Sequence, residues 1–146
     1  MKRTLTAIIF IVPLLVGGQV SRNEKTGKVN NEIIIMVNKR KFSATLENSA
    51  TANAFRELLP LTLKMTELNG NEKYFELPVN LPAKAARPGT IIAGDLMLWG
   101  SNTLVLFYET FSTSYSYTKI GKINDPGGLS TALGAGSATV VFEDHP

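Results

Sequence analysis

The sequence predicts an all-β domain (mainly strands), built as an antiparallel barrel or sandwich with one covering helix. Short segments in which apolar residues alternate recur along the chain, about seven or eight of them, with turn signals between them. One longer segment has the three- and four-residue spacing of a helix, and there is no internal repeat. With 146 residues, 44% of them hydrophobic, the chain can bury the core of one domain.

The first elements are a β-hairpin and the helix that follows it. Apolar residues alternate in residues 33–37 and again in residues 42–46, on either side of the turn NKRK. In ENSATANAFRELLP the period changes, so we expect a helix of about three turns. Asn48 or Ser49 is its capping residue and Pro60 ends it. The apolar side of this helix must cover part of the core.

The alternation returns after Pro60 and predicts a second hairpin. Residues 61–66 alternate between apolar and polar, and the chain comes back through EKYFELP. Between the two strands, Asn69-Gly70 accepts the positive φ of a type I′ turn. The segment VNLPAKAARPG contains several structure breakers, which predict a long loop.

Residues 90–109 predict two short strands around Gly100-Ser101-Asn102. Residues 103–108 are apolar on both parities, which is typical of a strand that is covered on both faces. We therefore expect Leu104 and Leu106 in the core, together with Leu63 from the preceding hairpin.

The remaining segments close the predicted sheet. TFSTS predicts a turn, and residues 114–118 alternate tyrosines with hydroxyl residues, which predicts a strand with Tyr115 and Tyr117 on one face. KIGKI continues as a strand, NDPGG is a turn, LSTALG predicts a short second helix, and ATVVFE is the last strand.

The N-terminus predicts export. A charged start, MKR, precedes an uncharged stretch over residues 5–16, and small residues follow up to Gly18. We expect a signal peptide at 1–18 cleaved near Gly18, a flexible leader at 19–31 and the domain at 32–146. The mature protein would be periplasmic or secreted, without a stable membrane span, because a span needs about 20 apolar residues. A retained membrane anchor is the alternative.

Composition excludes several classes of function. Lys2 and Arg3 account for part of the net charge of +3, so the rest of the chain is nearly neutral. Such a chain lacks the basic footprint of a nucleic-acid-binding protein. The absence of cysteine excludes a disulfide, a thiol nucleophile and lipid attachment of the lipoprotein kind. We expect no cofactor, because no nucleotide-binding glycine loop is present; GAGSA is a turn.

Three stretches together resemble the small bacterial cyclophilin-like fold proteins: FSATLENSATANAFRELLPLTLKMTELNGNEKYFELP, RPGTIIAGDLMLWGSNTLVLFYETFSTSYSYTKIGKI and DPGGL. The resemblance covers about residues 33–143. It implies a closed antiparallel β-barrel with a helix over one end, in agreement with the periodicity. It does not imply an activity, since fold alone does not carry function. The phenylalanine–histidine–arginine strand of active cyclophilins has no counterpart in this chain.

The residues predict no catalytic centre and no metal site. The single histidine, His145, lies one residue from the end, which excludes Ser–His and Cys–His pairs, and no His or carboxylate cluster has metal-ligand spacing. Asp95 and Glu109 could approach each other across neighbouring strands. The favoured interpretation is that Asp95 closes a turn and Glu109 ends a strand in solvent.

Aromatic and hydroxyl residues form the candidate ligand site. At the barrel mouth, large rings would make an apolar wall, hydroxyls would supply hydrogen bonds, and one loop arginine would lie nearby. These candidates are Arg87, Trp99, Tyr108, Ser112, Ser114, Tyr115 and Tyr117.

The leading hypothesis is a non-enzymatic module that binds a small ligand or an extended peptide. The alternative is a peptidyl-prolyl cis-trans isomerase with Arg87 as the donor to the prolyl nitrogen; it rests on the fold resemblance. A purely structural role is a third hypothesis. The sequence predicts no oligomeric state.

Overall fold

The computed structural model describes residues 30–146; the predicted signal peptide and most of the predicted leader lie outside the described residues. Within residues 30–146 the chain forms ten strands and two helices. In chain order these are β1 (Glu32–Val37), β2 (Arg40–Leu46), α1 (Ala50–Glu57), β3 (Leu61–Leu68), β4 (Glu72–Glu76), β5 (Thr90–Ile91), β6 (Asp95–Trp99), β7 (Thr103–Phe107), β8 (Phe111–Ser112), β9 (Thr118–Ile123), α2 (Leu129–Leu133) and β10 (Ala138–Asp144).

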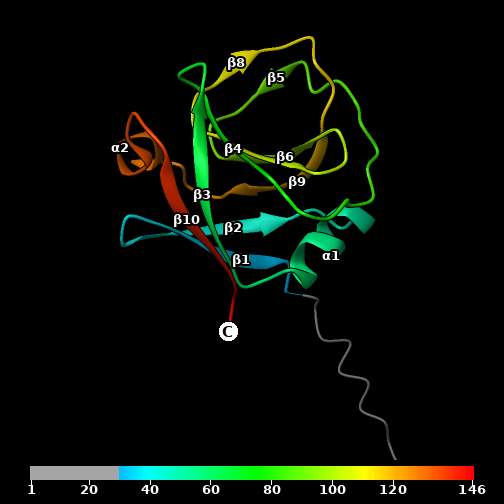
Figure 1. The fold of residues 1–146 in the computed structure, drawn as a ribbon, viewed down its shortest axis with the longest axis horizontal. Coiled ribbons are helices and arrows are strands. Elements are labelled where there is room, and N and C mark those ends of the chain that lie inside the picture. Colours follow the sequence, from blue (N-terminus) through cyan, green and yellow to red (C-terminus); the bar gives the residue numbers. More distant parts are fainter. Residues whose placement is uncertain (1–29) are drawn as a thin grey trace, which may run out of the picture.

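Eight of the described strands close into a barrel, in the order β1-β10-β3-β4-β7-β6-β9-β2. Every neighbouring pair is antiparallel, and the pairing of β2 with β1 closes the ring. Figure 1 shows α1 and α2 on opposite sides of this barrel. The predicted fold class, a closed antiparallel barrel with a covering helix and a short second helix, is confirmed.

Two tight turns set the register of the first hairpins. Asn38 and Lys39 join β1 to β2 with φ values of 52° and 66°. Asn69 and Gly70 join β3 to β4 with φ values of 57° and 66°, as the Asn-Gly pair predicts. Positive φ at both central positions is the geometry of a type I′ turn, whose twist matches that of the flanking strands.

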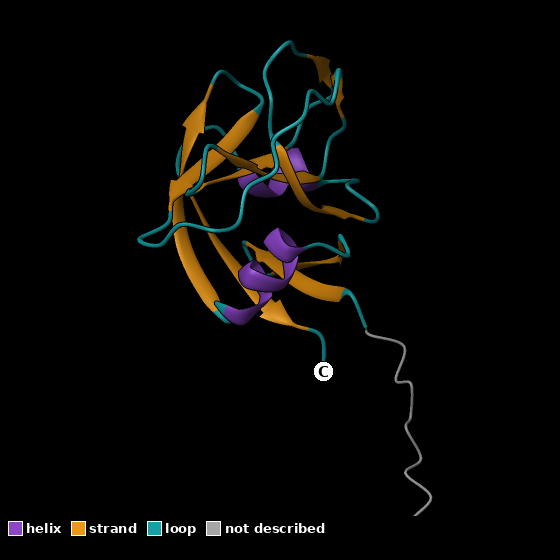
Figure 2. Cartoon of the chain, turned by 90° about the vertical axis from the view of Figure 1, so that its right-hand side faces the viewer, coloured by secondary structure: helices purple, strands orange, loops and turns teal. Residues whose placement is uncertain are grey.

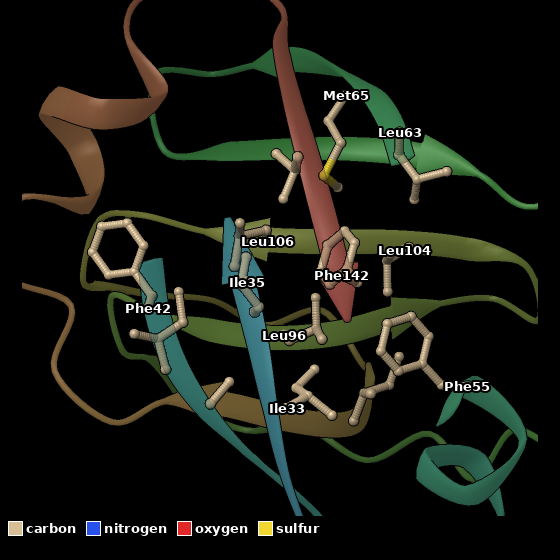
Figure 3. Close-up of a cluster of buried hydrophobic side chains, with 14 of the residues drawn as sticks. Ile33, Ile35, Phe42, Phe55, Leu63, Met65, Leu96, Leu104, Leu106 and Phe142 are labelled. Atoms are coloured by element: carbon tan, nitrogen blue, oxygen red, sulfur yellow. The ribbon is translucent and has the colours of Figure 1, made fainter. Parts of the chain in front are cut away.

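The barrel interior is a continuous hydrophobic core. Alternate residues of every strand point inward, and the labelled side chains of Figure 3 meet there. The side chain of Ser49 caps α1 by accepting a hydrogen bond from the Ala52 backbone at 3.1 Å. Phe55 of α1 then packs edge-on against Phe142, with ring centroids 5.6 Å apart, and closes one end of the barrel. The prediction that Leu63 is buried is confirmed.

Strand β7 is covered on both faces, as its apolar run predicts. Leu104 and Leu106 face the barrel interior and are fully buried. Val105 and Phe107 face outward into a second cluster of buried residues. The two-stranded sheet of β5 and β8, which lies outside the barrel in Figures 1 and 2, contributes Ile91 and Phe111 to that cluster.

Two details of the predicted elements are wrong. The helix α1 spans eight residues, about two turns rather than three. Residues 114–116 are not a strand, and β8 lies where a turn was expected. The reason is the length of the partner strand: β6 pairs Leu98 with Thr118 and then ends at Trp99, so residues before Tyr117 find no partner in the barrel. Tyr117 forms only an isolated bridge with Ala86.

Candidate functional site

A cleft of about 660 Å³ lies against the outer face of β4 and β7, on the flank of the barrel. We call it the flank cleft. It is lined by Leu68, Asn69, Asn71, Glu72, Tyr74, Glu76, Trp99, Thr103, Val105, Phe111, Ser112, Thr113, Ser114, Tyr115 and Tyr117.

The floor of the flank cleft follows from strand register. Tyr74 on β4 pairs with Val105 on β7, and two residues further along β4, Glu76 pairs with Thr103. Thr103 in turn pairs with Trp99 on β6. These residues lie on the side of the sheet opposite to the barrel core, because neighbouring residues of a strand alternate between the two faces.

Three aromatic residues form the aromatic wall of the flank cleft: Trp99, Tyr115 and Tyr117. The ring of Trp99 lies 5.4 Å from that of Tyr115, with an angle of 86° between the planes, and 5.5 Å from that of Tyr117. Tyr117 is anchored by an edge contact with Phe107 at 5.4 Å. Trp99 and Tyr115 are 44% and 62% exposed, so their rings are accessible to a ligand.

Backbone hydrogen bonds hold the segment that carries Tyr115. The Thr113 backbone donates to the Gly89 carbonyl at 2.9 Å, next to the pairing of β5 with β8. The Tyr115 backbone donates to the Thr113 hydroxyl at 3.1 Å. This side of the flank cleft is therefore formed by the fold itself, before any ligand arrives.

The β3–β4 hairpin forms the opposite wall. Its turn residue Asn71 donates a backbone hydrogen bond to Leu68 and accepts one from the Tyr108 backbone, at 3.3 and 3.0 Å. The side-chain Oδ1 of Asn71 is buried and has no hydrogen-bond partner within residues 30–146.

All charged side chains that line the flank cleft are negative. Glu72 and Glu76 are its only charged lining residues, and neither forms an ion pair within the described part of the chain. Burial raises the pKa of the Glu72 carboxyl, and the negative charge of Glu67 raises it further. Burial also raises the pKa of Tyr117, with a smaller contribution from the charge of Glu72. The Tyr117 hydroxyl and the Glu72 carboxylate are thus both partly shielded from water.

The sequence profile described as the cyclophilin-like family matches residues 35–143, about three quarters of the chain. The chain belongs to the cyclophilin-like family. The search of curated proteins found no match. The family assignment agrees with the closed barrel but does not name a ligand, so the interpretation of the flank cleft depends on its own residues.

Five of the seven predicted site residues meet in the flank cleft of this cyclophilin-like barrel. They are Trp99, Ser112, Ser114, Tyr115 and Tyr117. The cleft lies on the outer flank, so the expectation that these residues surround the barrel mouth is wrong. The reason is the parity of the strands: Trp99 lies on the outward face of β6, whereas the inward face carries Leu96 and Leu98. Whether these residues contact a ligand stays a prediction.

Tyr108 is not among the lining residues and lies at the barrel end opposite α1. Its hydroxyl donates a hydrogen bond to Oε1 of Glu67, and its ring lies 5.1 Å from the ammonium group of Lys73. Lys73 is fully buried and donates to Glu67 at 3.0 Å and to the carbonyls of Gly134 and Gly136 at 2.7 Å. A satisfied ion pair therefore fills this end of the barrel.

Arg87 is also absent from the lining of the flank cleft. It is exposed and lines a second depression together with Lys84, Lys119 and the start of α1, and this depression shares only Tyr117 with the flank cleft. The other two arginines of the described chain are held elsewhere: Arg40 bonds to carbonyls before α2, and Arg56 pairs with Asp144 at 2.7 Å. No arginine lies on a strand beside the flank cleft within residues 30–146.

Sequence reasoning missed the contribution of β4. Glu72, Tyr74 and Glu76 alternate along EKYFE and all face the flank cleft. The sequence shows that these three residues share one face of β4. Which face of β4 points outward depends on its register with β7. The interpretation of Asp95 is consistent with the structure, since its carboxylate accepts a hydrogen bond from the Ile92 backbone at 2.9 Å and closes a turn. Burial raises the pKa of that carboxyl.

The described residues contain no group of three or more His, Cys, Asp or Glu side chains that could hold a metal ion. Among these residues there is also no helix with the length and apolar character needed to cross a membrane.

Proposed function

We propose that this cyclophilin-like domain is a non-enzymatic binding module whose flank cleft holds a small ligand or an extended peptide. The observation that carries the proposal is the aromatic wall of Trp99, Tyr115 and Tyr117, two of whose rings stay exposed beside an open cleft. Large exposed rings cost free energy in water, and burying them against a ligand recovers it.

The size and lining of the flank cleft support the proposal. Its volume of about 660 Å³ falls in the range of sites that bind small molecules. Apolar walls are combined with a few hydrogen-bonding groups: Ser112, Thr113, Ser114 and Thr103. The serines have no histidine or lysine beside them in the lining that could act as a base, which favours binding over acyl transfer.

The position of Arg87 argues against the isomerase alternative. A donor to the prolyl nitrogen must lie beside the pocket that holds the proline ring, and Arg87 lines a neighbouring depression that shares only Tyr117 with the flank cleft. We therefore expect no acceleration in a proline-isomerisation assay on a short peptide. Clear acceleration by the wild type that is lost in Arg87→Ala would contradict the binding-module proposal.

The flank cleft provides its own reporter, because Trp99 is the only tryptophan of the chain. A ligand and peptide screen followed by Trp99 fluorescence, with thermal shift as a second readout, tests the proposal. Tyr115→Ala should weaken the binding of a hit about three- to tenfold, as expected for the loss of one aromatic contact. Ser116→Ala removes an exposed neighbour that does not line the cleft and serves as the matched control.

We also propose that the protein is exported. The proposal rests on the charged start, the apolar stretch and the small residues before Gly18. N-terminal sequencing of the protein made in a bacterial host should find a new N-terminus near Gln19. An intact Met1 in a membrane fraction would instead favour a retained anchor.

A further inference from the structure

The flank cleft is acidic although the protein is not. The whole chain carries a net charge of +3, yet the cleft contains two carboxylates and no basic side chain. The alternation of β4 produces this separation: Glu72, Tyr74 and Glu76 point outward, while Lys73 between them points into the barrel. The ammonium group nearest in sequence therefore does not neutralise the carboxylates of the cleft.

Glu72 is the more buried of the two carboxylates of the flank cleft. It is half-buried and pairs on the neighbouring strand with Phe107, which belongs to the buried aromatic cluster behind Tyr117. Within the described residues Glu72 has neither an ion-pair partner nor a side-chain hydrogen bond. A partly desolvated carboxylate without a partner is unfavourable, and a bound cation would offset that cost.

The aromatic wall favours the same kind of ligand. Ring faces carry negative electrostatic potential and attract organic cations within about 6 Å of the ring centroid. Trp99 and Tyr115 stand almost at right angles, so they form a corner in which a cation can contact both rings. Tyr74 on the floor adds an aromatic side chain to the three of the aromatic wall. Carboxylates and ring faces thus converge on one cleft, and both favour positive charge.

We infer that the flank cleft binds a small organic cation, with its ammonium group between the carboxylates of β4 and the aromatic wall. This inference rests on the proposed function and adds the chemical class of the ligand. The occupant is a free small molecule rather than a protein, because the volume of about 660 Å³ suits a single compact ligand.

The experiment compares charged and uncharged ligands of the same shape. Choline and 3,3-dimethylbutan-1-ol, its uncharged carbon isostere, are titrated while Trp99 fluorescence is recorded. Benzyltrimethylammonium and neopentylbenzene, its uncharged carbon isostere, form a second pair. We expect the dissociation constant of each cation to be at least about fivefold lower than that of its neutral partner, as cation–π contact allows. Equal or tighter binding of both neutral partners would overturn the cation inference and leave the proposed function intact.

Charge-neutralising variants test whether the preference for a cation comes from the carboxylates of the flank cleft. Glu72→Gln should weaken choline binding about threefold or more and leave dimethylbutanol binding unchanged. Glu57→Gln removes an exposed carboxylate on α1, outside the cleft, and should change neither. Thermal melts of both variants confirm that they are folded. An equal loss of choline binding in both variants would overturn the inference, since the attraction would then come from overall charge.

Two further outcomes separate the proposals. If neither cation changes the fluorescence while neutral compounds of the ligand screen do, the cation inference fails and the proposed function stands. If no cation, neutral compound or peptide changes it, both fail. A blocked lysine tripeptide that binds more tightly than both cations would assign the site to a peptide side chain and overturn the inference of a free small molecule.

Discussion

The charged side chains on the two faces of β4 differ in whether the fold supplies them with partners. On the inner face, Lys73 is fully buried and donates to Glu67 and to two backbone carbonyls. On the outer face, Glu72 and Glu76 border the flank cleft, and neither has an ion-pair partner within residues 30–146. Five consecutive residues thus contain one charge with an ion-pair partner and two charges without one.

The contrast separates a structural role from a binding role. A buried charge whose partners are all supplied by the fold has nothing left to offer a ligand. A carboxylate that borders an open cleft without a partner keeps its capacity to bind one. Lys73 is the more deeply buried of the two, yet the fold supplies its partners, whereas the half-buried Glu72 has no ion-pair partner within residues 30–146.

Removing the inner charge should have the largest effect on stability. Lys73→Met retains an unbranched apolar side chain but removes the ammonium group, so Glu67 loses its ion-pair partner and the carbonyls of Gly134 and Gly136 lose this donor. We expect a loss of about 3–5 kcal/mol in the free energy of unfolding, as for other broken buried ion pairs. Urea denaturation of the wild type and the variant measures it.

The double variant Lys73→Met with Glu67→Gln provides the control. It removes both charges, so it should be less destabilised than the sum of the two single variants predicts. Additive losses would contradict the view that these residues act as a pair.

The two sides of β7 extend the comparison to apolar residues. Leu106 lies in the closed barrel interior, so Leu106→Ala should cost about 2–5 kcal/mol in the free energy of unfolding. Val105 faces the flank cleft, where Val105→Ala removes fewer carbon atoms beside open space. Its loss should be clearly smaller. A reversed ranking in denaturant melts would mean that the outer cluster, not the barrel core, dominates stability.

Sequence patterns predict the features that depend on residues close together in the chain. The turns at Asn38-Lys39 and Asn69-Gly70, the capped helix and the two-sided burial of β7 all follow from residues that are neighbours in the chain. The aromatic residues of the candidate site could be named for the same reason, because large rings and hydroxyls stand out in any composition.

Contacts between distant segments could not be predicted. The burial of Lys73 depends on carbonyls 61 and 63 residues away, which the sequence around Lys73 does not reveal. The position of the cleft on the flank depends on the register of β4, β7 and β6. Tyr108 is a candidate because of its large ring, and no residue next to it in the sequence shows that it bonds to Glu67 and lies against Lys73.

Neutralising the outer carboxylate should have a smaller effect that depends on pH. Burial, and then the charge of Glu67, raise the pKa of Glu72 in the folded protein above its ordinary value of 4.5. The folded state therefore binds the proton more tightly than the unfolded state, and this carboxyl lowers stability as the pH rises through that window. Glu72→Gln cannot ionise, so it should be more stable than the wild type at neutral pH.

The advantage of Glu72→Gln should disappear in acid, below the ordinary pKa of 4.5, where both forms are uncharged. Thermal melts across this pH range measure it, and the exposed Glu76→Gln serves as the control. An equal advantage at every pH would mean that the amide stabilises by packing rather than by removing an unpaired charge.

The smallest effect is expected at Ser116, on the segment that carries the aromatic wall. Ser116 is exposed and lies between Tyr115, which borders the flank cleft, and Tyr117, which is buried at its edge. The strand β9 begins only at Thr118, so Ser116 has no partner in the barrel sheet. Ser116→Ala should therefore change the free energy of unfolding by no more than about 0.5 kcal/mol. If denaturant melts show a larger loss, the Ser116 hydroxyl stabilises the segment that carries the aromatic wall. The residues around the flank cleft would then contribute to the stability of the fold as well as to binding.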